Sequence, residues 1–301
     1  MITPPYLKPG DTIGIVCPAG HMDRARAEQC IETLGAWGFS VRTGKTLGHA
    51  WHYFAGTDTE RLEDLQQMLD DPSVRAILCG RGGYGTSRII DRLDFTRFMA
   101  APKWIIGFSD VTVLHTHLYS VLGTASLHAP MAGAFNGEGA GGPYVESLHK
   151  ALTGGKAAYT CAPHPFNREG SAEAVLAGGN LSLLTHLSGS VSELDTTGIL
   201  LFMEDIGEYL YNIDRMMIQL QRSGKLDQLS GFIVGGFTDM KDTVVPFGQT
   251  AEELIRDKVA AFPYPVCFGF PVSHGKENYA LKIGARYRLE VKTGGSALTE
   301  L

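Results

Sequence analysis

The hydrophobic pattern of the first half of the chain alternates between two periods. Short apolar runs bounded by turn residues are typical of buried strands, and apolar residues spaced three or four apart are typical of helices. Strands are predicted at residues 12–19, 39–44, 74–80 and 103–108. Helices are predicted at residues 24–38, 58–72 (with Asp58 as its N-cap), 86–93 and 111–123. This alternation indicates βαβ units and a parallel sheet with right-handed crossovers.

The pattern changes after Met131. Glycine is frequent in residues 132–146, and residues 151–172 mix glycine, proline and polar residues as a domain junction does. Short strands are then predicted at 172–179, 198–205, 229–237, 265–272 and 285–291, with one main helix at 211–224. The predicted fold class is therefore α/β: a parallel-sheet N-terminal domain (residues 1–150), a linker (151–170) and a β-rich α+β C-terminal domain (171–301).

Composition narrows the class of protein. The 301 residues are 44% hydrophobic and 19% charged, as in a globular protein with a sizeable core. A net charge of −6 without a long Lys or Arg run argues against nucleic acid or an anionic membrane as partner. Prolines at positions 4, 5 and 9 interrupt any signal-peptide core, and no apolar run could span a bilayer. Five scattered cysteines without a C-x-x-C pair favour a reducing compartment, so we expect a cytoplasmic protein.

The histidines and cysteines lack the spacing of a metal site. The sequence contains no H-E-x-x-H and no Cys/His cluster with zinc spacing. His115 and His117 lie two apart on a predicted helix, so their side chains diverge. We therefore expect neither a catalytic metal nor an organic cofactor.

The glycine-rich stretch GRGGYG, residues 80–85, follows a predicted strand and satisfies G-x-G-x-x-G. It suggests a dinucleotide-binding protein, with Asp110 about 25 residues later as the ribose acid. Three features count against this: the loop follows a later strand of the series, Arg81 lies inside it, and Asp110 directly follows a serine. The glycines could serve only tight turns, or Gly82 and Gly83 could present backbone N–H groups to a substrate.

Ser109 follows the predicted strand 103–108 in the stretch GFSDVT. Catalysis in parallel sheets takes place at the carboxyl ends of the strands, where a serine on a sharp turn can act as a nucleophile. A serine before an apolar helical run is also the usual N-cap, and Val111 replaces the second glycine of a G-x-S-x-G elbow. By itself, the motif favours a cap over a nucleophile.

Two distant stretches could complete a catalytic set with Ser109. An apolar strand runs into Glu204, and His274 stands before a glycine in a loop that also contains Asn278. Taken singly, each of these polar residues is more often an incidental loop residue. Ser109, Glu204 and His274 nevertheless follow the nucleophile–acid–base chain order of α/β-hydrolases.

Five stretches together resemble the L,D-carboxypeptidases of the serine-peptidase type, which include muramoyl-tetrapeptide carboxypeptidases and microcin C self-immunity peptidases. The resemblance covers essentially the whole chain, in order, through GRGGYGTSRIIDRLDF, GFSDVTVLH, GGNLSLLTHLSGS, LFMEDIGEYLYNIDRMMIQL and SHGKENYALKIGA. The E-D-I-G-E-Y and Y-N-I-D-R patterns are closer to the murein branch than to the microcin branch. Cys17 departs from the serine expected in its turn, which bears on substrate contacts.

The resemblance implies a nucleophile in the N-terminal domain, an acid and a base in the C-terminal domain, and a homodimer. It assigns the nucleophile to Ser109, the acid to Glu204 with Glu208 as the second choice, and the base to His274. It also implies release of D-alanine from murein tetrapeptides during peptidoglycan recycling.

Further roles follow from the chemistry that the resemblance implies. The oxyanion hole would use the backbone N–H of Asp110 and one from Gly82 or Gly83. Arg81 is the candidate for binding the terminal carboxylate, and Asn278 is a second candidate for substrate binding.

Three alternatives remain open at this level. The first is a microcin-type peptidase that cleaves a peptidyl- or aminoacyl-nucleotide conjugate. The second is a dinucleotide-binding protein that uses GRGGYG, and the third is a non-catalytic binding module on the same scaffold. The main prediction remains a small peptide or muropeptide as substrate, with neither nucleic acid nor a membrane as partner.

Overall fold

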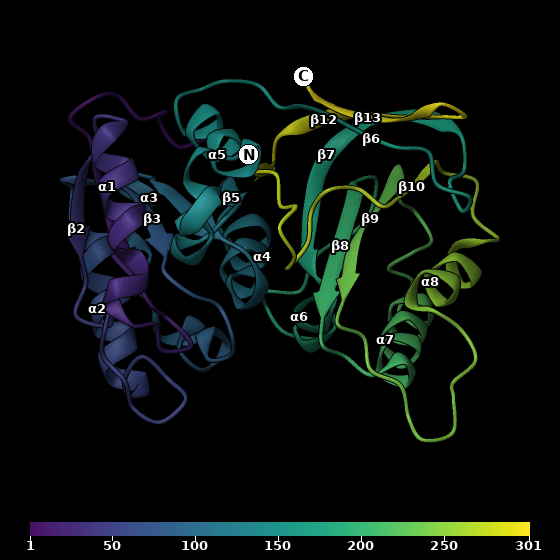
Figure 1. The fold of residues 1–301 in the computed structure, drawn as a ribbon, viewed down its shortest axis with the longest axis horizontal. Coiled ribbons are helices and arrows are strands. Elements are labelled where there is room, and N and C mark those ends of the chain that lie inside the picture. The colour runs from purple at the N-terminus through teal and green to yellow at the C-terminus, as the bar shows by residue number, and fades with distance from the viewer. The chain divides into compact units, whose positions relative to one another are not determined.

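The computed structural model describes residues 1–301 apart from the side chains of residues 138 and 140. The backbone divides into two compact units (Figure 1). Unit 1 comprises Met1–Gly155 and Tyr279–Ile283, and unit 2 comprises Lys156–Asn278 and Gly284–Leu301. The sequence placed the first domain at 1–150 and a linker at 151–170, whereas the units change over at Gly155 and residues 279–283 return to unit 1.

Unit 1 is built on a six-stranded sheet with the order β11-β5-β4-β3-β1-β2. Its strands are β1 (Thr12–Val16), β2 (Ser40–Thr43), β3 (Val74–Cys79), β4 (Trp104–Gly107), β5 (Ser126–His128) and β11 (Leu281–Ile283). All neighbours pair in parallel except β11, which is antiparallel to β5. The predicted parallel α/β architecture is confirmed, and its four predicted strands all form.

The helices of unit 1 follow their strands as βαβ connectivity requires. They are α1 (Glu28–Ala36), α2 (Asp58–Asp70), α3 (Thr96–Ala100), α4 (Thr112–Ser120) and α5 (Pro143–Leu152). The apolar faces of the strands and helices form one core, with Ile13, Ile15, Leu78, Ile106 and Leu127 at its centre. Burial of these alternating apolar positions is the main force that holds the sheet to its helices.

Two local predictions for unit 1 are wrong. Thr57, not Asp58, is the N-cap of α2, because its hydroxyl accepts the Glu60 N–H while the Glu60 carboxylate accepts the Thr57 N–H. Residues 86–93 form two 3₁₀ turns, Thr86–Arg88 and Ile90–Arg92, instead of an α-helix. The Thr86 N–H is already bound to the Asp110 carboxylate, and so short a segment cannot propagate a regular helix.

Unit 2 contains a seven-stranded mixed sheet with the order β10-β9-β8-β7-β12-β13-β6. Its strands are β6 (Ala158–Cys161), β7 (Gly170–Asn180), β8 (Leu200–Ile206), β9 (Gly231–Thr238), β10 (Val266–Phe268), β12 (Arg286–Lys292) and β13 (Gly295–Glu300). Its helices are α6 (Leu181–His186), α7 (Leu210–Arg222) and α8 (Ala251–Val259). The predicted β-rich character is confirmed, and all five predicted strands form at least in part.

Within unit 2, β7, β8, β9 and β10 are parallel, so their carboxyl ends share one edge of the sheet. β8 and β9 run side by side toward that edge (Figure 1). β6 forms inside the segment expected as a linker, and β13 and α8 were not predicted at all.

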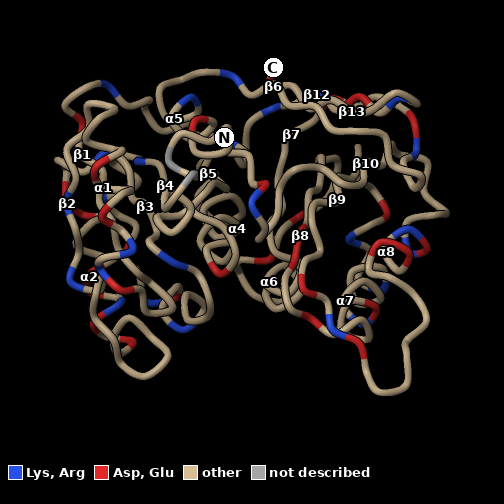
Figure 2. The backbone as a smooth tube through the Cα atoms, viewed as in Figure 1, with Lys and Arg blue, Asp and Glu red and all other residues tan. Residues whose placement is uncertain are grey.

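Charged residues of both signs are interspersed along the two units (Figure 2). Within the described chain, no helix combines the length and apolar character that crossing a membrane requires.

Candidate active site

Ser109 lies on a strained turn between β4 and α4. Its φ is +62°, a left-handed conformation that costs a residue with a side chain roughly 1–2 kcal/mol. Gly107, with φ +155°, makes the turn possible, since a Cβ there would lie 2.8 Å from the Val111 side chain. The N-cap of α4 is Val111, without a side-chain cap hydrogen bond, so Ser109 does not cap this helix. Strain of this kind, held by the surrounding fold, is typical of a nucleophile turn.

A buried histidine supports this turn from behind. His115, fully buried on α4, has its Nε2 2.8 Å from the Gly107 carbonyl oxygen and its Nδ1 2.9 Å from Ser126 Oγ. A carbonyl oxygen only accepts, so Nε2 carries the proton and Nδ1 accepts the Ser126 hydroxyl. Burial lowers the pKa of His115 to about 4, which keeps the ring neutral.

The glycine-rich loop lies directly beside Ser109. A Cβ placed on Gly82 would be 3.2 Å from Ser109 Oγ and 3.3 Å from the Asp110 nitrogen. Gly82 also accepts the Gly20 N–H at 3.0 Å, and Gly83 has φ +98°. The structure thus brings the serine together with the three residues predicted for the oxyanion hole, all within unit 1.

Asp110 contributes more than its backbone. Its fully buried carboxylate accepts the Thr86 N–H at 2.8 Å, which ties the end of the glycine-rich loop to the nucleophile turn. Burial raises the pKa of this carboxyl, and the Thr86 hydrogen bond opposes that rise. A carboxylate held in this way is not available to a ribose, which removes the acid that the dinucleotide-binding alternative requires.

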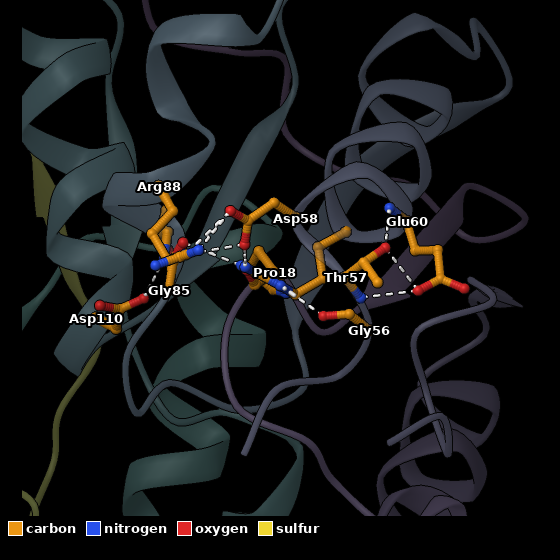
Figure 3. Close-up of polar contacts among 10 residues, drawn as sticks. Pro18, Gly56, Thr57, Asp58, Glu60, Gly85, Arg88 and Asp110 are labelled. Atoms are coloured by element: carbon orange, nitrogen blue, oxygen red, sulfur yellow. Dashed lines mark hydrogen bonds and ion pairs between the residues drawn. The ribbon is translucent and has the colours of Figure 1, made fainter. Parts of the chain in front are cut away.

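Arg61, which was not among the residues singled out from the sequence, anchors the same end of this loop at Gly85. Its contact residues Pro18, Gly56, Asp58 and Gly85 are drawn in Figure 3. Its fully buried guanidinium donates to the Gly85 carbonyl at 3.0 Å, to the Gly56 carbonyl at 3.2 Å and to the Pro18 carbonyl. It also pairs with Asp58, which binds Arg88 in turn. The sequence signal that could have identified Arg61 is its position among the apolar residues of α2, because a buried charge there needs hydrogen-bond or ionic partners.

Arg81, inside the glycine-rich loop, contacts the turn after β1. Its side chain is exposed, and one guanidinium nitrogen donates to the His21 carbonyl at 2.7 Å.

In unit 2, the carboxyl ends of the parallel strands bring Glu204 and His274 together. Glu204 is fully buried near the end of β8, and its Oε2 is hydrogen-bonded to Nδ1 of His274 in the loop after β10. The carboxylate accepts, so Nδ1 carries a proton, and in the neutral form of the ring Nε2 is the nitrogen that carries none. Burial raises the pKa of Glu204, and the adjacent His274 opposes that rise.

Two adjacent glycines on β9 make room for the histidine loop. A Cβ on Gly235 would lie 2.2 Å from the Val272 carbonyl oxygen, and one on Gly236 would lie 2.5 Å from the Ser273 Cβ. Only glycine allows the segment before His274 to approach the strand this closely. Gly235 and Gly236 therefore set how close to β9 the loop lies that brings His274 to the Glu204 carboxylate.

The structure distinguishes the two candidate acids. The Glu208 carboxylate accepts from Asn212 at 2.9 Å and from the Ser182 hydroxyl at 3.3 Å, and its recorded contacts do not include His274. Asp205 is likewise occupied by Asn180 and Ser182. Of the two candidate acids, Glu204 is thus the one whose carboxylate is hydrogen-bonded to His274.

Asn278 is buried after the histidine loop, where its backbone bridges to Val272. Neither side-chain amide atom has a hydrogen-bond partner among the described residues. Within the same residues, no group of three or more His, Cys, Asp or Glu is placed to hold a metal ion.

A serine on a strand–turn–helix and a buried carboxylate–histidine pair are the parts from which serine hydrolases are built. Residues 13–129 match the LD-carboxypeptidase N-terminal domain, and residues 173–289 match the LD-carboxypeptidase C-terminal domain. The chain belongs to the LD-carboxypeptidase family and is a carboxypeptidase. The resemblance inferred from the sequence is thereby confirmed, and the dinucleotide-binding alternative is disfavoured.

Individual relatives span nearly the full chain. A probable murein peptide carboxypeptidase of Bacillus subtilis is 37% identical, over 94% of this chain and 90% of the relative. The murein tetrapeptide carboxypeptidase of Pseudomonas aeruginosa is 30% identical, over 92% of each chain. The microcin C7 self-immunity protein MccF of Escherichia coli is 27% identical, over 97% of this chain and 94% of the relative.

A solved structure has the same fold. The muramoyltetrapeptide carboxypeptidase from Oxalobacter formigenes superposes with a TM-score of 0.86 at 28% identity, covering 96% of this chain and 98% of that one.

Proposed function

We propose that this enzyme hydrolyses the L,D-peptide bond that holds the C-terminal D-alanine of murein tetrapeptides, through an acyl-enzyme on Ser109. The observation that carries the proposal is the left-handed φ of +62° at Ser109, at the end of a parallel strand and beside Gly82. Relatives named murein peptide and murein tetrapeptide carboxypeptidases, at 37% and 30% identity, support the substrate class.

In the first step, Ser109 Oγ attacks the carbonyl carbon of the residue before D-alanine. His274 Nε2 takes the hydroxyl proton and then gives it to the departing amine of D-alanine. Glu204 stays ionised, holds the Nδ1–H and stabilises the imidazolium. Water then attacks the ester, with His274 again acting as the base, and Ser109 is released.

The negative charge that develops on the carbonyl oxygen needs N–H donors fixed in advance. We assign these to the backbone of Asp110 and of Gly82 or Gly83, each worth on the order of 3 kcal/mol in the transition state. Their support is the contact between Gly82 and Ser109, and the anchoring of the loop by Arg61 and Asp110.

Two further residues are proposed to bind the substrate. Arg81, exposed in the glycine-rich loop, would bind the terminal carboxylate by a charge-assisted hydrogen bond. Asn278 has a buried amide without a protein partner among the described residues, and a substrate peptide group could satisfy it.

The proposed setting is peptidoglycan recycling in the cytoplasm, with the protein as a homodimer. All five cysteines are free, which is what a reducing compartment produces.

Incubation with muramoyl tetrapeptide, with D-alanine detected by mass spectrometry, tests this proposal. Ser109→Ala should lower the rate by roughly 10³-fold or more. Ser120→Ala, which changes an exposed serine at the end of α4, is the matched control and should keep full activity.

Unchanged activity of the Ser109→Ala enzyme would refute the nucleophile assignment. Cleavage of an aminoacyl-nucleotide conjugate without release of D-alanine from the tetrapeptide would favour the microcin-type activity instead.

A further inference from the structure

Four aromatic side chains cluster on and beside the glycine-rich loop and have no role in the proposed chemistry. They are Trp51, Tyr53, Phe54 and Tyr84, which we call the aromatic platform. Trp51 is 43% exposed, Tyr53 50% and Tyr84 46%, although large aromatic surfaces usually leave water on folding. Exposed aromatic residues that cluster in this way indicate a binding surface.

Phe54 is the centre of the platform. The rings of Trp51, Tyr53 and Tyr84 lie 6.2, 5.4 and 6.1 Å from its ring, measured between centroids. The buried Arg61 guanidinium lies 4.8 Å from the Phe54 ring centroid. The residue that anchors the glycine-rich loop therefore also fixes the centre of the platform.

The backbone holds the exposed rings in place. Trp51 and Phe54 exchange two backbone hydrogen bonds, at 2.8 and 3.0 Å, which close a tight loop. His52 inside it has φ +54°, a strained conformation for a residue with a side chain. The Tyr53 carbonyl accepts the His21 N–H at 3.1 Å, which joins the loop to the turn after β1. The rings are thus presented to solvent on a rigid support, which lowers the entropic cost of binding a ligand.

The platform begins close to Ser109. A Cβ on Gly83 would lie 2.6 Å from the Tyr53 hydroxyl oxygen, and the neighbouring Gly82 touches Ser109. With about 3.8 Å between consecutive Cα atoms, these contacts place the Tyr53 hydroxyl at most about 13 Å from Ser109 Oγ.

We propose that the aromatic platform is a subsite for the sugar ring of muramoyl peptides, so that the enzyme prefers substrates that retain the sugar. This inference rests on the proposed function. A pyranose ring has an apolar face of C–H groups that packs on an aromatic ring, and hydroxyls that the Tyr53 and Tyr84 hydroxyls can bind.

The spacing fits this ligand. In a muramoyl tetrapeptide, three residues separate the scissile carbonyl from the sugar, and three extended residues span roughly 10 Å. That length lies within the upper bound of about 13 Å on the distance between Ser109 Oγ and the Tyr53 hydroxyl.

The test compares N-acetylmuramoyl-tetrapeptide with the free tetrapeptide. For the wild-type enzyme, kcat/KM should be higher with the sugar, and Trp51→Ala should lower the ratio of the two values by about tenfold. Trp51→Phe keeps an aromatic face and should retain most of the preference. Tyr211→Ala, which removes a comparably exposed tyrosine (41%) from α7, is the control and should leave the ratio unchanged.

Binding is measured separately in the Ser109→Ala protein by tryptophan fluorescence. Trp104 is fully buried and Trp37 is partly buried against the core, so the exposed Trp51 should give a blue shift with the muramoyl peptide and not with the free tetrapeptide. If the wild-type enzyme releases no D-alanine from either substrate, the proposed function fails, while this titration still decides the subsite.

Equal effects of Trp51→Ala on both substrates, or no effect on either, would overturn the subsite. So would a change in oligomeric state of the Trp51→Ala protein in sedimentation equilibrium, because the platform would then be an interface between copies of the chain.

Discussion

The neutral His115 behind the nucleophile turn should make unit 1 sensitive to acid. Its ring is fully buried, and Nε2–H donates to the Gly107 carbonyl while Nδ1 accepts from Ser126. Replacing it by glutamine keeps an N–H donor of similar reach and removes the titrating group. The change therefore separates the hydrogen bond from the proton.

The size of the effect follows from the two pKa values. Burial lowers the pKa of His115 from 6.5 to about 4, so the unfolded chain takes up a proton that the folded protein refuses. The stability that this group contributes is fully present above pH 6.5 and is lost as the pH falls toward 4. At 1.36 kcal/mol for each pKa unit, the difference between 6.5 and about 4 corresponds to roughly 3 kcal/mol of unfolding free energy.

Urea unfolding between pH 7 and 4.5 measures this loss. All three tryptophans, at positions 37, 51 and 104, lie in unit 1, so their fluorescence reports the unfolding of that unit. His115→Gln should be less stable than wild type at pH 7, by about 1–3 kcal/mol for the altered buried contacts, and the two profiles should converge as the pH falls. His186→Gln, at an exposed position on α6, should give a profile parallel to wild type. Parallel profiles for His115→Gln and wild type would refute the reasoning.

Three further predictions concern unit 2. Glu204→Gln should lower kcat roughly 10³-fold or more in the tetrapeptide assay, because an amide can hold His274 in the wrong tautomer, and a decrease below tenfold would contradict this role. Gly235→Ala should lower the unfolding free energy by roughly 1–3 kcal/mol in urea titrations, because its Cβ would lie 2.2 Å from the Val272 carbonyl oxygen, and a protein of wild-type stability would disprove that constraint. Cys161 should be the first thiol alkylated by iodoacetamide at pH 8, because a hydrogen bond from the Cys267 thiol lowers its pKa to about 7 and the other four cysteines are buried. Fast labelling that persists in Cys161→Ser would count against this prediction.

Much of the fold could be predicted from the sequence because its signals are local. The alternation of apolar strands with helix-periodic segments specified four strands of the parallel sheet in unit 1, and β8 and β9 were visible as apolar runs. The helix predicted at 86–93 was wrong because the pattern does not record that the Asp110 carboxylate already binds the Thr86 N–H. Short strands such as β6 and β13 depend on pairing with each other, which their own composition does not indicate.

The same difference between local signals and long-range contacts decides which residues of the candidate site could be predicted. Ser109, Glu204 and His274 could be proposed because their motifs, in order, resemble a family. Arg61 could not be proposed, because its contacts to the Pro18 and Gly85 carbonyls join parts of the chain far apart in sequence. The sequence can show that a charged residue occupies an apolar position of a helix, but it cannot show which groups that residue binds.

Three glycines near the candidate site, Gly83, Gly235 and Gly236, leave room for a side chain or segment from elsewhere in the chain. Gly235 and Gly236 interrupt an apolar strand, which from sequence alone suggests a bulge or a close backbone approach, without saying of what. The structure supplies the approaching segment, Val272 and Ser273, which is followed by His274 and its hydrogen bond to Glu204. Gly83 has the same relation to Tyr53, since a side chain there would displace the tyrosine hydroxyl. In both places glycine provides the space for a segment that carries a side chain of the proposed site. Under that proposal, the cost of substituting the glycine should appear in catalysis and substrate preference as well as in stability.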